Sequence, residues 1–357
     1  MQTLPGLMAV LTDGECESVR LHGSGGAATA TYLRQGEDIW VADDLESDEL
    51  HTAELASAIR RGFGTRWDGL DCFLAGEKVE YAMEGSSIRV RRLAASASAS
   101  DAESDEAGLK AVADALGIPK SKRRHKLKQA RQFARIVATA LPESGKQTLR
   151  VLDLACGRSY LGFVLVHELS AGGRRVELHG VDSGPVLVQK CREIAGALEW
   201  QNATFEAADL SSHSTEPGTY DIMVALHGCD TLTDEALRIG WEARIPLMFA
   251  APCCQHELRH LWGAHPLEWV SRYGLLEQRL ADVLTDAFRC LVLEALGYRV
   301  KVLRFAAPDV TPKNLLIQAE LTGEREPGRA AAARAFMKQF GARPRLASVL
   351  EAAETGQ

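Results

Sequence analysis

The chain has 357 residues, a net charge of −7, and the hydrophobic (46%) and charged (25%) shares of a globular protein, which excludes collagen-like, coiled-coil and wholly disordered classes. The longest apolar run, residues 245–254, is too short to span a bilayer, and the acidic residues at 13, 15 and 17 lead us to expect no signal peptide. The eight cysteines form no CxxC pair, which argues against a zinc ribbon or a disulfide framework. We therefore expect a cytoplasmic protein without membrane contact.

The first part of the chain is strongly acidic. Residues 1–93 hold 9 basic and 16 acidic residues, and their pattern predicts a small α+β accessory domain. We expect strands at 18–21 and 38–42, a helix at 47–62, and a strand pair within 70–93 that turns near residue 84. No chemistry is visible there.

Residues 94–108 read AASASASDAESDEAG, without any aromatic or branched apolar residue. Such a segment buries too little surface to offset its ordering entropy, so the sequence predicts a flexible acidic linker. Beyond it, residues 108–357 hold 32 basic and 28 acidic residues, so an anionic partner would bind this part of the chain.

Residues 109–323 alternate apolar runs with helical patterns, which is typical of a doubly wound, mostly parallel sheet. We expect seven strands, at 149–155, 176–181, 204–208, 220–226, 245–251, 299–305 and 315–321. No helix separates the last two, which predicts a closing antiparallel hairpin. Residues 324–357 are rich in Ala and Arg and predict a helical tail with a break at Pro344.

A basic run opens this α/β region. It contains no acidic residue and eight cations, Lys120, Lys122, Arg123, Arg124, Lys126, Lys128, Arg131 and Arg135. Such runs are often only the solvated face of a helix, but this density favours contact with nucleic-acid phosphates, with Phe133 as an apolar anchor.

The strongest motif is VLDLACGRSYLG at 151–162. An apolar strand that ends in an acid, followed by a turn of small residues and a helix, places a ligand site at the carboxyl edge of the sheet. Gly157 lets a ligand approach the backbone, and Asp153 can hold the loop or accept from a ligand amine. The next strand ends in Asp182, placed to accept ribose hydroxyls, and the third ends before Asp209, placed to read an adenine amino group.

This succession of strand ends resembles the class I S-adenosylmethionine-dependent methyltransferases over about residues 109–323. That family's first motif usually has three glycines, and here only Gly157 remains, with Ala155 and Ser159 at the other two positions. The alternatives are a dinucleotide-binding Rossmann domain, which has a stricter glycine turn and no hairpin, and an α/β fold that binds no nucleoside. The resemblance implies S-adenosylmethionine as cofactor.

The turn after the fourth strand, ALHGCDTLTD at 225–234, faces the methyl group in this family. His227 suits a general base, Asp230 suits its orienting partner, and residues 231–234 also fit a helix N-terminus. A histidine of purely structural role is the alternative. The Asn/Asp-Pro-Pro-aromatic turn of amino-group methyltransferases is absent, which disfavours exocyclic adenine or cytosine nitrogens as targets.

The turn after the fifth strand reads APCCQHE at 251–257. Cys253 and Cys254 allow four interpretations: small apolar residues at the rim, metal ligands together with Cys229 and His227, a nucleophile that adds to a pyrimidine, or substrate binding without covalent chemistry.

The turn of the closing hairpin reads DVTPKNLLI at 309–317. Pro312 and Asn314 are residue types that suit a turn. Lys313, between them, can reach a substrate phosphate or assist a substrate hydroxyl in losing its proton.

The blocks GRSYLGF, ALHGCDT, APCCQHEL, TDAFRCLVLEALGY and TPKNLLI resemble an uncharacterised bacterial methyltransferase family. More distantly, the two turns after the fourth and fifth strands are similar to the eukaryotic tRNA ribose 2′-O-methyltransferases of the acceptor stem, although the extra zinc-finger cysteines of those enzymes are absent. The resemblance implies a methyltransferase that acts on structured RNA, tRNA or rRNA, at a ribose 2′-hydroxyl or a base. The alternatives are a methyltransferase of a protein or small metabolite, and a non-catalytic nucleoside-binding module.

The predicted residues fall into three groups, with no metal ligands assigned. The catalytic group is His227, Asp230, Cys254, His256 and Lys313. The cofactor group is Asp153, Ala155, Cys156, Gly157, Tyr160, Asp182, Ser183, Asp209, Leu210 and Leu226. The RNA group is Lys120, Lys122, Arg123, Arg124, Lys126, Lys128 and Arg131.

Overall fold

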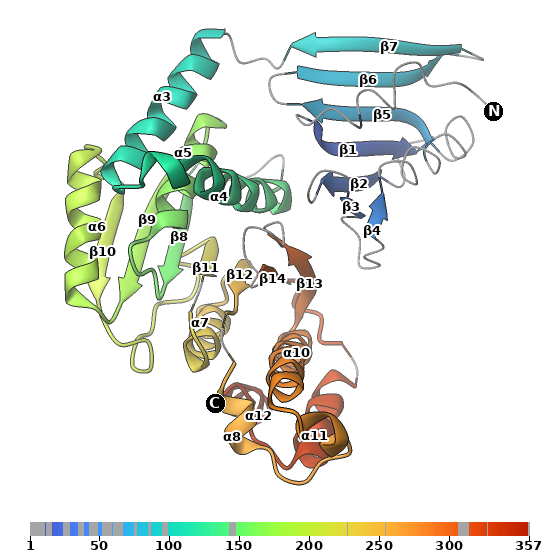
Figure 1. Ribbon diagram of the computed structural model, residues 1–357, viewed down its shortest axis with the longest axis vertical. Coiled ribbons are helices and arrows are strands. Elements are labelled where there is room, and N and C mark those ends of the chain that lie inside the picture. Colours follow the sequence, from blue (N-terminus) through green and yellow to red (C-terminus); the bar gives the residue numbers. More distant parts are fainter. Residues whose placement is uncertain are drawn as a thin grey trace. The chain divides into compact units, whose positions relative to one another are not determined.

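The computed structural model describes residues 11, 16–23, 29–34, 39–42, 49–51, 59, 67–74, 77–84, 87–94, 99–142, 148–226, 228–253, 255–305, 314–326 and 328–355. The chain divides into two compact units, Met1–Ala107 and Gly108–Gln357 (Figure 1). Within the described residues, no helix has the length and apolar character needed to cross a membrane.

The first unit contains a seven-stranded sheet in the order β4-β3-β2-β1-β5-β6-β7, with every neighbouring pair antiparallel. Its strands are β1 Cys16–Gly23, β2 Thr29–Arg34, β3 Ile39–Ala42, β4 Glu49–His51, β5 Trp67–Leu74, β6 Glu77–Glu84 and β7 Ser87–Ala94. The expected turn near residue 84 joins β6 to β7. The helix expected at 47–62 is wrong at its start, where β4 forms by pairing with β3, a long-range contact that local periodicity does not reveal.

Helix α3, Ala99–Ala115, covers most of the segment for which the sequence predicted an irregular linker. The prediction weighed the missing apolar residues of 94–108 and neglected the high helix propensity of alanine. It also neglected the residues that follow. Leu109 and Val112, in the second half of α3, are buried in the core of the second unit and stabilise the helix from that end.

The second unit contains the predicted seven-stranded, mostly parallel sheet. Its strands are β8 Thr148–Leu154, β9 Arg175–Asp182, β10 Ala203–Ala207, β11 Ile222–Leu226, β12 Leu247–Ala251, β13 Tyr298–Arg304 and β14 Leu315–Leu321. Their order is β10-β9-β8-β11-β12-β14-β13. The first five strands are parallel, and β14 lies antiparallel between β12 and β13. The closing hairpin is thereby confirmed.

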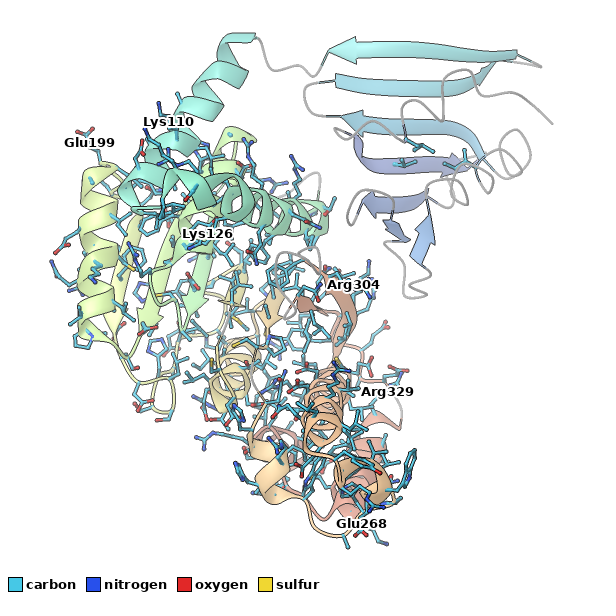
Figure 2. All side chains as sticks on the ribbon, viewed as in Figure 1. Lys110, Lys126, Glu199, Glu268, Arg304 and Arg329 are labelled. Atoms are coloured by element: carbon cyan, nitrogen blue, oxygen red, sulfur yellow. The ribbon has the colours of Figure 1, made fainter. Side chains whose placement is uncertain are left out.

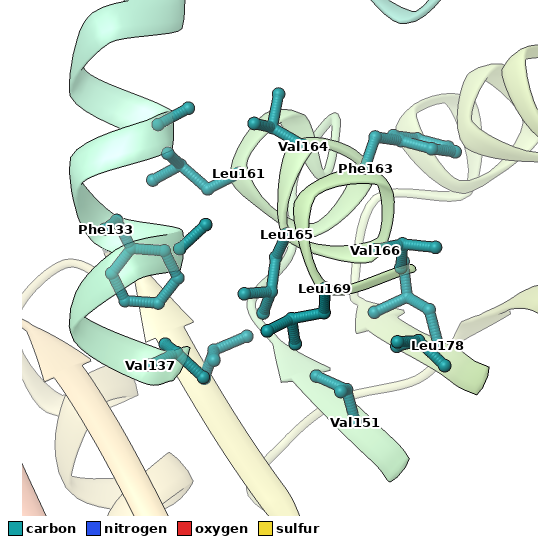
Figure 3. Packing of buried hydrophobic residues seen from close by; sticks show 14 of the residues in the cluster. Phe133, Val137, Val151, Leu161, Phe163, Val164, Leu165, Val166, Leu169 and Leu178 are labelled. Atoms are coloured by element: carbon teal, nitrogen blue, oxygen red, sulfur yellow. The ribbon is translucent and has the colours of Figure 1, made fainter. Parts of the chain in front are cut away.

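Helices cover both faces of this sheet. They are α4 Lys120–Ala140, α5 Tyr160–Ala171, α6 Pro185–Ala197, α7 Thr231–Glu242, α8 Glu257–Leu261, α9 Glu268–Ser271, α10 Gly274–Ala295, α11 Arg329–Phe340 and α12 Ala347–Thr355. Side chains of successive strand residues alternate between two cores. Val151 packs with α3–α6 in one core (Figure 3), and Leu152 packs with α7 and α10–α12 in the other.

The topology places one set of loops together. Because β8–β12 are parallel, their carboxyl ends meet at one edge of the sheet, and the loops that follow them lie along this edge. The predicted cofactor residues lie in these loops or at the strand and helix ends that border them, and so do the predicted catalytic residues Asp230 and His256. His227, Cys254 and Lys313 lie outside the described residues.

Candidate functional site at the carboxyl edge of the sheet

The loop after β8 has an unusual backbone. Ala155, Gly157 and Ser159 all have a positive φ, at 54°, 56° and 46°. Only glycine adopts this conformation without strain, and other residues need their surroundings to hold them in it. The loop therefore keeps a three-glycine backbone path although two of the glycines are replaced. A Cβ placed on Gly157 would meet no atom within 4 Å, so the backbone there borders open space that a ligand can enter.

A buried hydrogen bond supports this loop from below. Ser159 Oγ donates to Asp153 Oδ2 at 2.6 Å, and Asp153 is only 4% exposed. Burial, aided by the nearby charge of Asp182, raises the pKa of Asp153 to about 7, against the lowering effect of the Ser159 bond. Asp153 thus holds the loop, which is one of the two roles that the sequence allowed. Gly162 is required here because a Cβ would lie closer than 3 Å to both oxygen atoms.

Asp182, at the end of β9, ties two loops together. Its Oδ2 accepts from the N–H of Gly157 at 2.8 Å, and its Oδ1 accepts from the N–H of Gly184 at 2.8 Å. Each carboxylate oxygen has a second lone pair, so the side chain can still accept hydroxyl groups such as those of a ribose. Ser183, beside it, is exposed.

The Cys156 thiol points into the protein. A Cβ on Gly180 would lie 3.2 Å from the Cys156 Sγ. A hydrogen bond with Cys191 and, to a smaller extent, burial raise the pKa of the Cys156 thiol. Cys191 Sγ in turn donates to the carbonyl of Gly157 at 3.3 Å. The Cys156 side chain is thus held by contacts within the protein.

Tyr160 begins helix α5 directly after the loop. Its Oη is buried and, within the described part of the chain, has no hydrogen-bond partner. Burial raises the pKa of the phenol, so the hydroxyl stays a neutral donor. A buried hydroxyl without a partner beside an open loop indicates a ligand or water contact. Lys126 Nζ of α4 lies 5.7 Å from the ring centroid.

The loop after β10 supplies one more carboxylate. Asp209 is exposed, and its Oδ1 accepts from the N–H of Ser211 at 2.9 Å, a bond that lowers the pKa of the carboxyl. Leu210 is buried beneath it. Sequence reasoning missed Val186, which is 67% exposed in the first turn of α6, close in sequence to Asp182. The only sequence signal was a branched apolar residue four positions after the strand-end acid Asp182.

Asp230, in the loop after β11, has a strained backbone with φ 54° and ψ −125°. Its Oδ1 accepts from the N–H groups of His256 and Glu257, both at 2.9 Å. The carboxylate thus binds the first turn of α8 and joins the loops after β11 and β12. Its predicted partner, His227, lies outside the described residues, so the orienting role stays a prediction. Leu226 is half-buried at the end of β11, and His256 is exposed.

Arg289, in the middle of α10, fixes this half of the site and was missed by sequence reasoning. It is 1% exposed, binds both oxygens of Asp234 at 2.6 and 2.9 Å, and donates to Asp286 at 3.0 Å and to the Asp230 carbonyl at 2.9 Å. Burial opposes its charge, but the two carboxylates outweigh burial and raise the pKa of Arg289. Asp286 also accepts from Gln255 Nε2, at 3.0 and 3.1 Å to its two oxygens. The only local signal was an arginine within an apolar stretch.

Two thiols lie together at this edge. Cys229 Sγ and Cys253 Sγ are 3.2 Å apart. Among the side chains that the structure describes, no group of three or more His, Cys, Asp or Glu residues is placed to hold a metal. The metal interpretation of the cysteines therefore gains no support from these described side chains.

The basic helix α4 differs in part from its prediction. Arg123 pairs with Asp114 at 2.5 Å and Arg131 with Glu168 at 2.7 Å, so these two cations already have acidic partners. Lys120 and Lys126 are exposed. The side chains of Lys122, Arg124 and Lys128 are outside the described set. The apolar anchor proposed for nucleic acid is wrong, because Phe133 is fully buried and packs edge-on against Phe249.

Residues 125–261, less than half of the chain, match a protein family described as "Methyltransferase domain". No curated protein matches the chain. Among solved structures, the chain is similar to a coclaurine N-methyltransferase (18% identity, TM-score 0.27), of which it covers 35% with 34% of its own residues. It thus spans about a third of the length of that protein.

Two bacterial structures are covered more fully. A TehB-like SAM-dependent methyltransferase from Corynebacterium glutamicum has 16% identity and a TM-score of 0.30, with 53% of this chain and 86% of that chain covered. A SAM-dependent methyltransferase from Aquifex aeolicus has 17% identity and a TM-score of 0.32, with 52% and 87% covered.

The residues along the edge fit S-adenosylmethionine. Gly157 borders open space, Asp182 can accept hydroxyls, and the Tyr160 hydroxyl has a donor to offer. The strand order of the chain's own sheet is that of the class I methyltransferase fold, and the family match covers the first five strands' loops up to α8. Residues 125–261 thus resemble a methyltransferase domain, the sheet has the strand order of the class I methyltransferase fold, and the residues at its carboxyl edge fit S-adenosylmethionine as cofactor.

Proposed function

We propose that the protein transfers a methyl group from S-adenosylmethionine to structured RNA, tRNA or rRNA. The observation that carries the substrate class is the position of α4 (Figure 2). This helix holds no acidic residue, and its Lys126 lies over the ring of Tyr160, which directly follows the cofactor loop. A phosphate chain that docks on α4 is thereby brought to the cofactor edge.

The buried face of α4 keeps this surface rigid. Ala130, Phe133 and Val137 pack in the same core as α5, and the Arg131–Glu168 pair joins the two helices. Lys120 and Lys126 are exposed on the helix. Their charges are thus presented by a packed element, which favours recognition of a folded RNA over a flexible peptide.

The two halves of the edge have separate roles in the proposed reaction. When bound, S-adenosylmethionine supplies an electrophilic methyl group on a sulfonium. On the donor side, the cofactor is held by Asp182, Gly157 and Tyr160. On the acceptor side, His227 or Lys313 accepts the proton that the substrate hydroxyl loses as it attacks, with Asp230, Cys254 and His256 around the acceptor.

The test is tritium transfer from labelled S-adenosylmethionine into total RNA and total protein from cells that lack the gene. We expect label in one RNA band with the wild-type protein and none with His227→Ala, which should bind the cofactor within about twofold of wild type. Label in protein alone would refute the RNA substrate. Cofactor binding without label in either pool would favour a small metabolite or a non-catalytic role.

The docking surface is tested with one charge reversal and its control. Lys126→Glu should weaken RNA binding about tenfold at low salt and reduce the salt dependence of binding. Lys338→Glu changes the same charge on an exposed position of α11, which packs in the other core, and should leave RNA binding unchanged. Equal effects of the two variants would place the RNA elsewhere.

A further inference from the structure

The thiols of Cys229 and Cys253, in the loops after β11 and β12, are held close together by the sheet. Leu226, at the end of β11, pairs with Ala251, at the end of β12, in parallel register. Cys229 and Cys253 follow these strand ends by three and two residues, and their sulfur atoms are 3.2 Å apart. The two residues are not joined by a disulfide.

The spacing suits a bond between them. The 3.2 Å between the two sulfur atoms already brings the side chains within reach of one another. The sulfur atoms need to approach by roughly 1.1 Å to reach the bond length of about 2.05 Å. Both residues lie in loops, where small changes of backbone angle provide this movement without disturbing the strands.

The other described thiols of the same unit are less exposed than Cys229. Cys191 is fully buried, and Cys156 is turned toward Gly180 and Cys191. Burial raises the pKa of Cys290 to about 12, so its thiolate is scarce at neutral pH. Cys229 is exposed and Cys253 is partly exposed. Among the described residues of this unit, Cys229 is thus the exposed thiol, and the sulfur atom of Cys253 lies 3.2 Å from its own.

We propose that Cys229 and Cys253 form a thiol–disulfide exchange site for small-molecule disulfides of the glutathione class. The exposed Cys229 thiolate attacks one sulfur of the small disulfide, which releases one thiolate and leaves a mixed disulfide on Cys229. The Cys253 thiolate then attacks the Cys229 sulfur and releases the second thiolate. Two protein thiols lose two electrons and two protons, and the small disulfide gains both to become two thiols.

The resulting bond would join the loops after β11 and β12 on the side where the acceptor is expected. Asp230 already links these loops through the N–H groups of His256 and Glu257. A covalent link beside this contact fixes the acceptor edge in one arrangement. An effect on methyl transfer rests on the proposed function, whereas the formation of the bond does not.

The experiment uses the full chain in mixtures of reduced and oxidised glutathione, followed by alkylation with N-ethylmaleimide and mass spectrometry. We expect the wild-type protein to lose two of its eight alkylatable thiols and to yield one peptide pair linked through Cys229 and Cys253. Cys229→Ser and Cys253→Ser should prevent the link. Cys191→Ser and Cys254→Ser should retain it.

Three results would overturn the proposal. They are retention of all eight alkylatable thiols in oxidised glutathione, a link from Cys229 to Cys254 in place of Cys253, and a glutathione adduct on Cys229 that does not resolve. Each is read from mass alone, so none depends on methyl transfer. If no RNA is labelled in the tritium experiment, the disulfide result still stands. The two proposals can therefore be refuted independently.

Discussion

The two halves of the carboxyl edge are built in different ways. On the donor side, Asp153 and Asp182 bind residues of their own or the neighbouring loop, through Ser159, Gly157 and Gly184. On the acceptor side, Arg289 reaches from α10, more than fifty residues along the chain, to hold Asp230 and Asp234. Local contacts therefore shape the donor side, and a distant buried charge shapes the acceptor side.

We expect the largest loss of stability from a substitution on the acceptor side. Arg289→Met removes the cation between Asp234 and Asp286 and leaves two buried carboxylates without it. Loss of one partner of a buried ion pair costs about 3–5 kcal/mol, which we expect as the fall in the free energy of unfolding measured in urea. Arg334→Met, which removes an exposed pair with Glu354, should cost less than about 1 kcal/mol. Equal losses would show that Arg289 does not hold the loops.

The next effect concerns the donor side and its pH dependence. The pKa of Asp153 is raised in the folded protein from its ordinary value of 3.8 to about 7. The stabilisation by protonated Asp153 is therefore complete below about pH 4 and is lost as the pH rises through about 7. Relative to Asp153→Asn, the wild-type protein should lose up to about 1.4 kcal/mol per pH unit in this window.

Thermal unfolding of both proteins from pH 4 to pH 8 measures this difference. Asparagine keeps an acceptor for Ser159 Oγ and carries no titratable proton, so it isolates the charge. Parallel stability curves for the two proteins would mean that the Asp153 carboxyl is not held in a buried site.

The smallest expected effect tests whether the backbone of the loop after β8, the donor loop, is strained. Ala155→Gly relieves the left-handed backbone of Ala155, and we expect the free energy of unfolding to rise by up to about 1 kcal/mol. Ala138→Gly, at an exposed position of α4, should lower it by about 1 kcal/mol because the helix favours alanine. A fall for both variants would contradict the strain at Ala155.

The difference between the donor and acceptor sides also explains which features could be predicted from the sequence. The seven strands and the hairpin were predictable because buried parallel strands are continuous apolar runs. The donor loop was recognisable because its residues are close in sequence. Arg289 was not, since its partners lie on other elements, and the positive φ of Ala155 and Ser159 is set by surroundings rather than by residue type.

Long-range contacts also explain the two wrong predictions in the first unit and α3. β4 forms because β3 offers a pairing edge, and α3 is stabilised where Leu109 and Val112 enter the core. Both depend on contacts that a local pattern does not contain. Val186 was overlooked for a simpler reason, since an exposed valine has no periodic pattern of its own.

The most direct test of the donor site is calorimetric titration of S-adenosylmethionine into the wild-type protein and two glycine variants. Gly157→Val and Gly218→Val both place a side chain on a backbone of positive φ with open space around it, so their strain is matched. Only Gly157 lies in the donor loop. We predict that Gly157→Val weakens binding at least about tenfold, roughly 1.4 kcal/mol, and that Gly218→Val binds like wild type. Equal affinities for both variants would contradict a cofactor site at this edge.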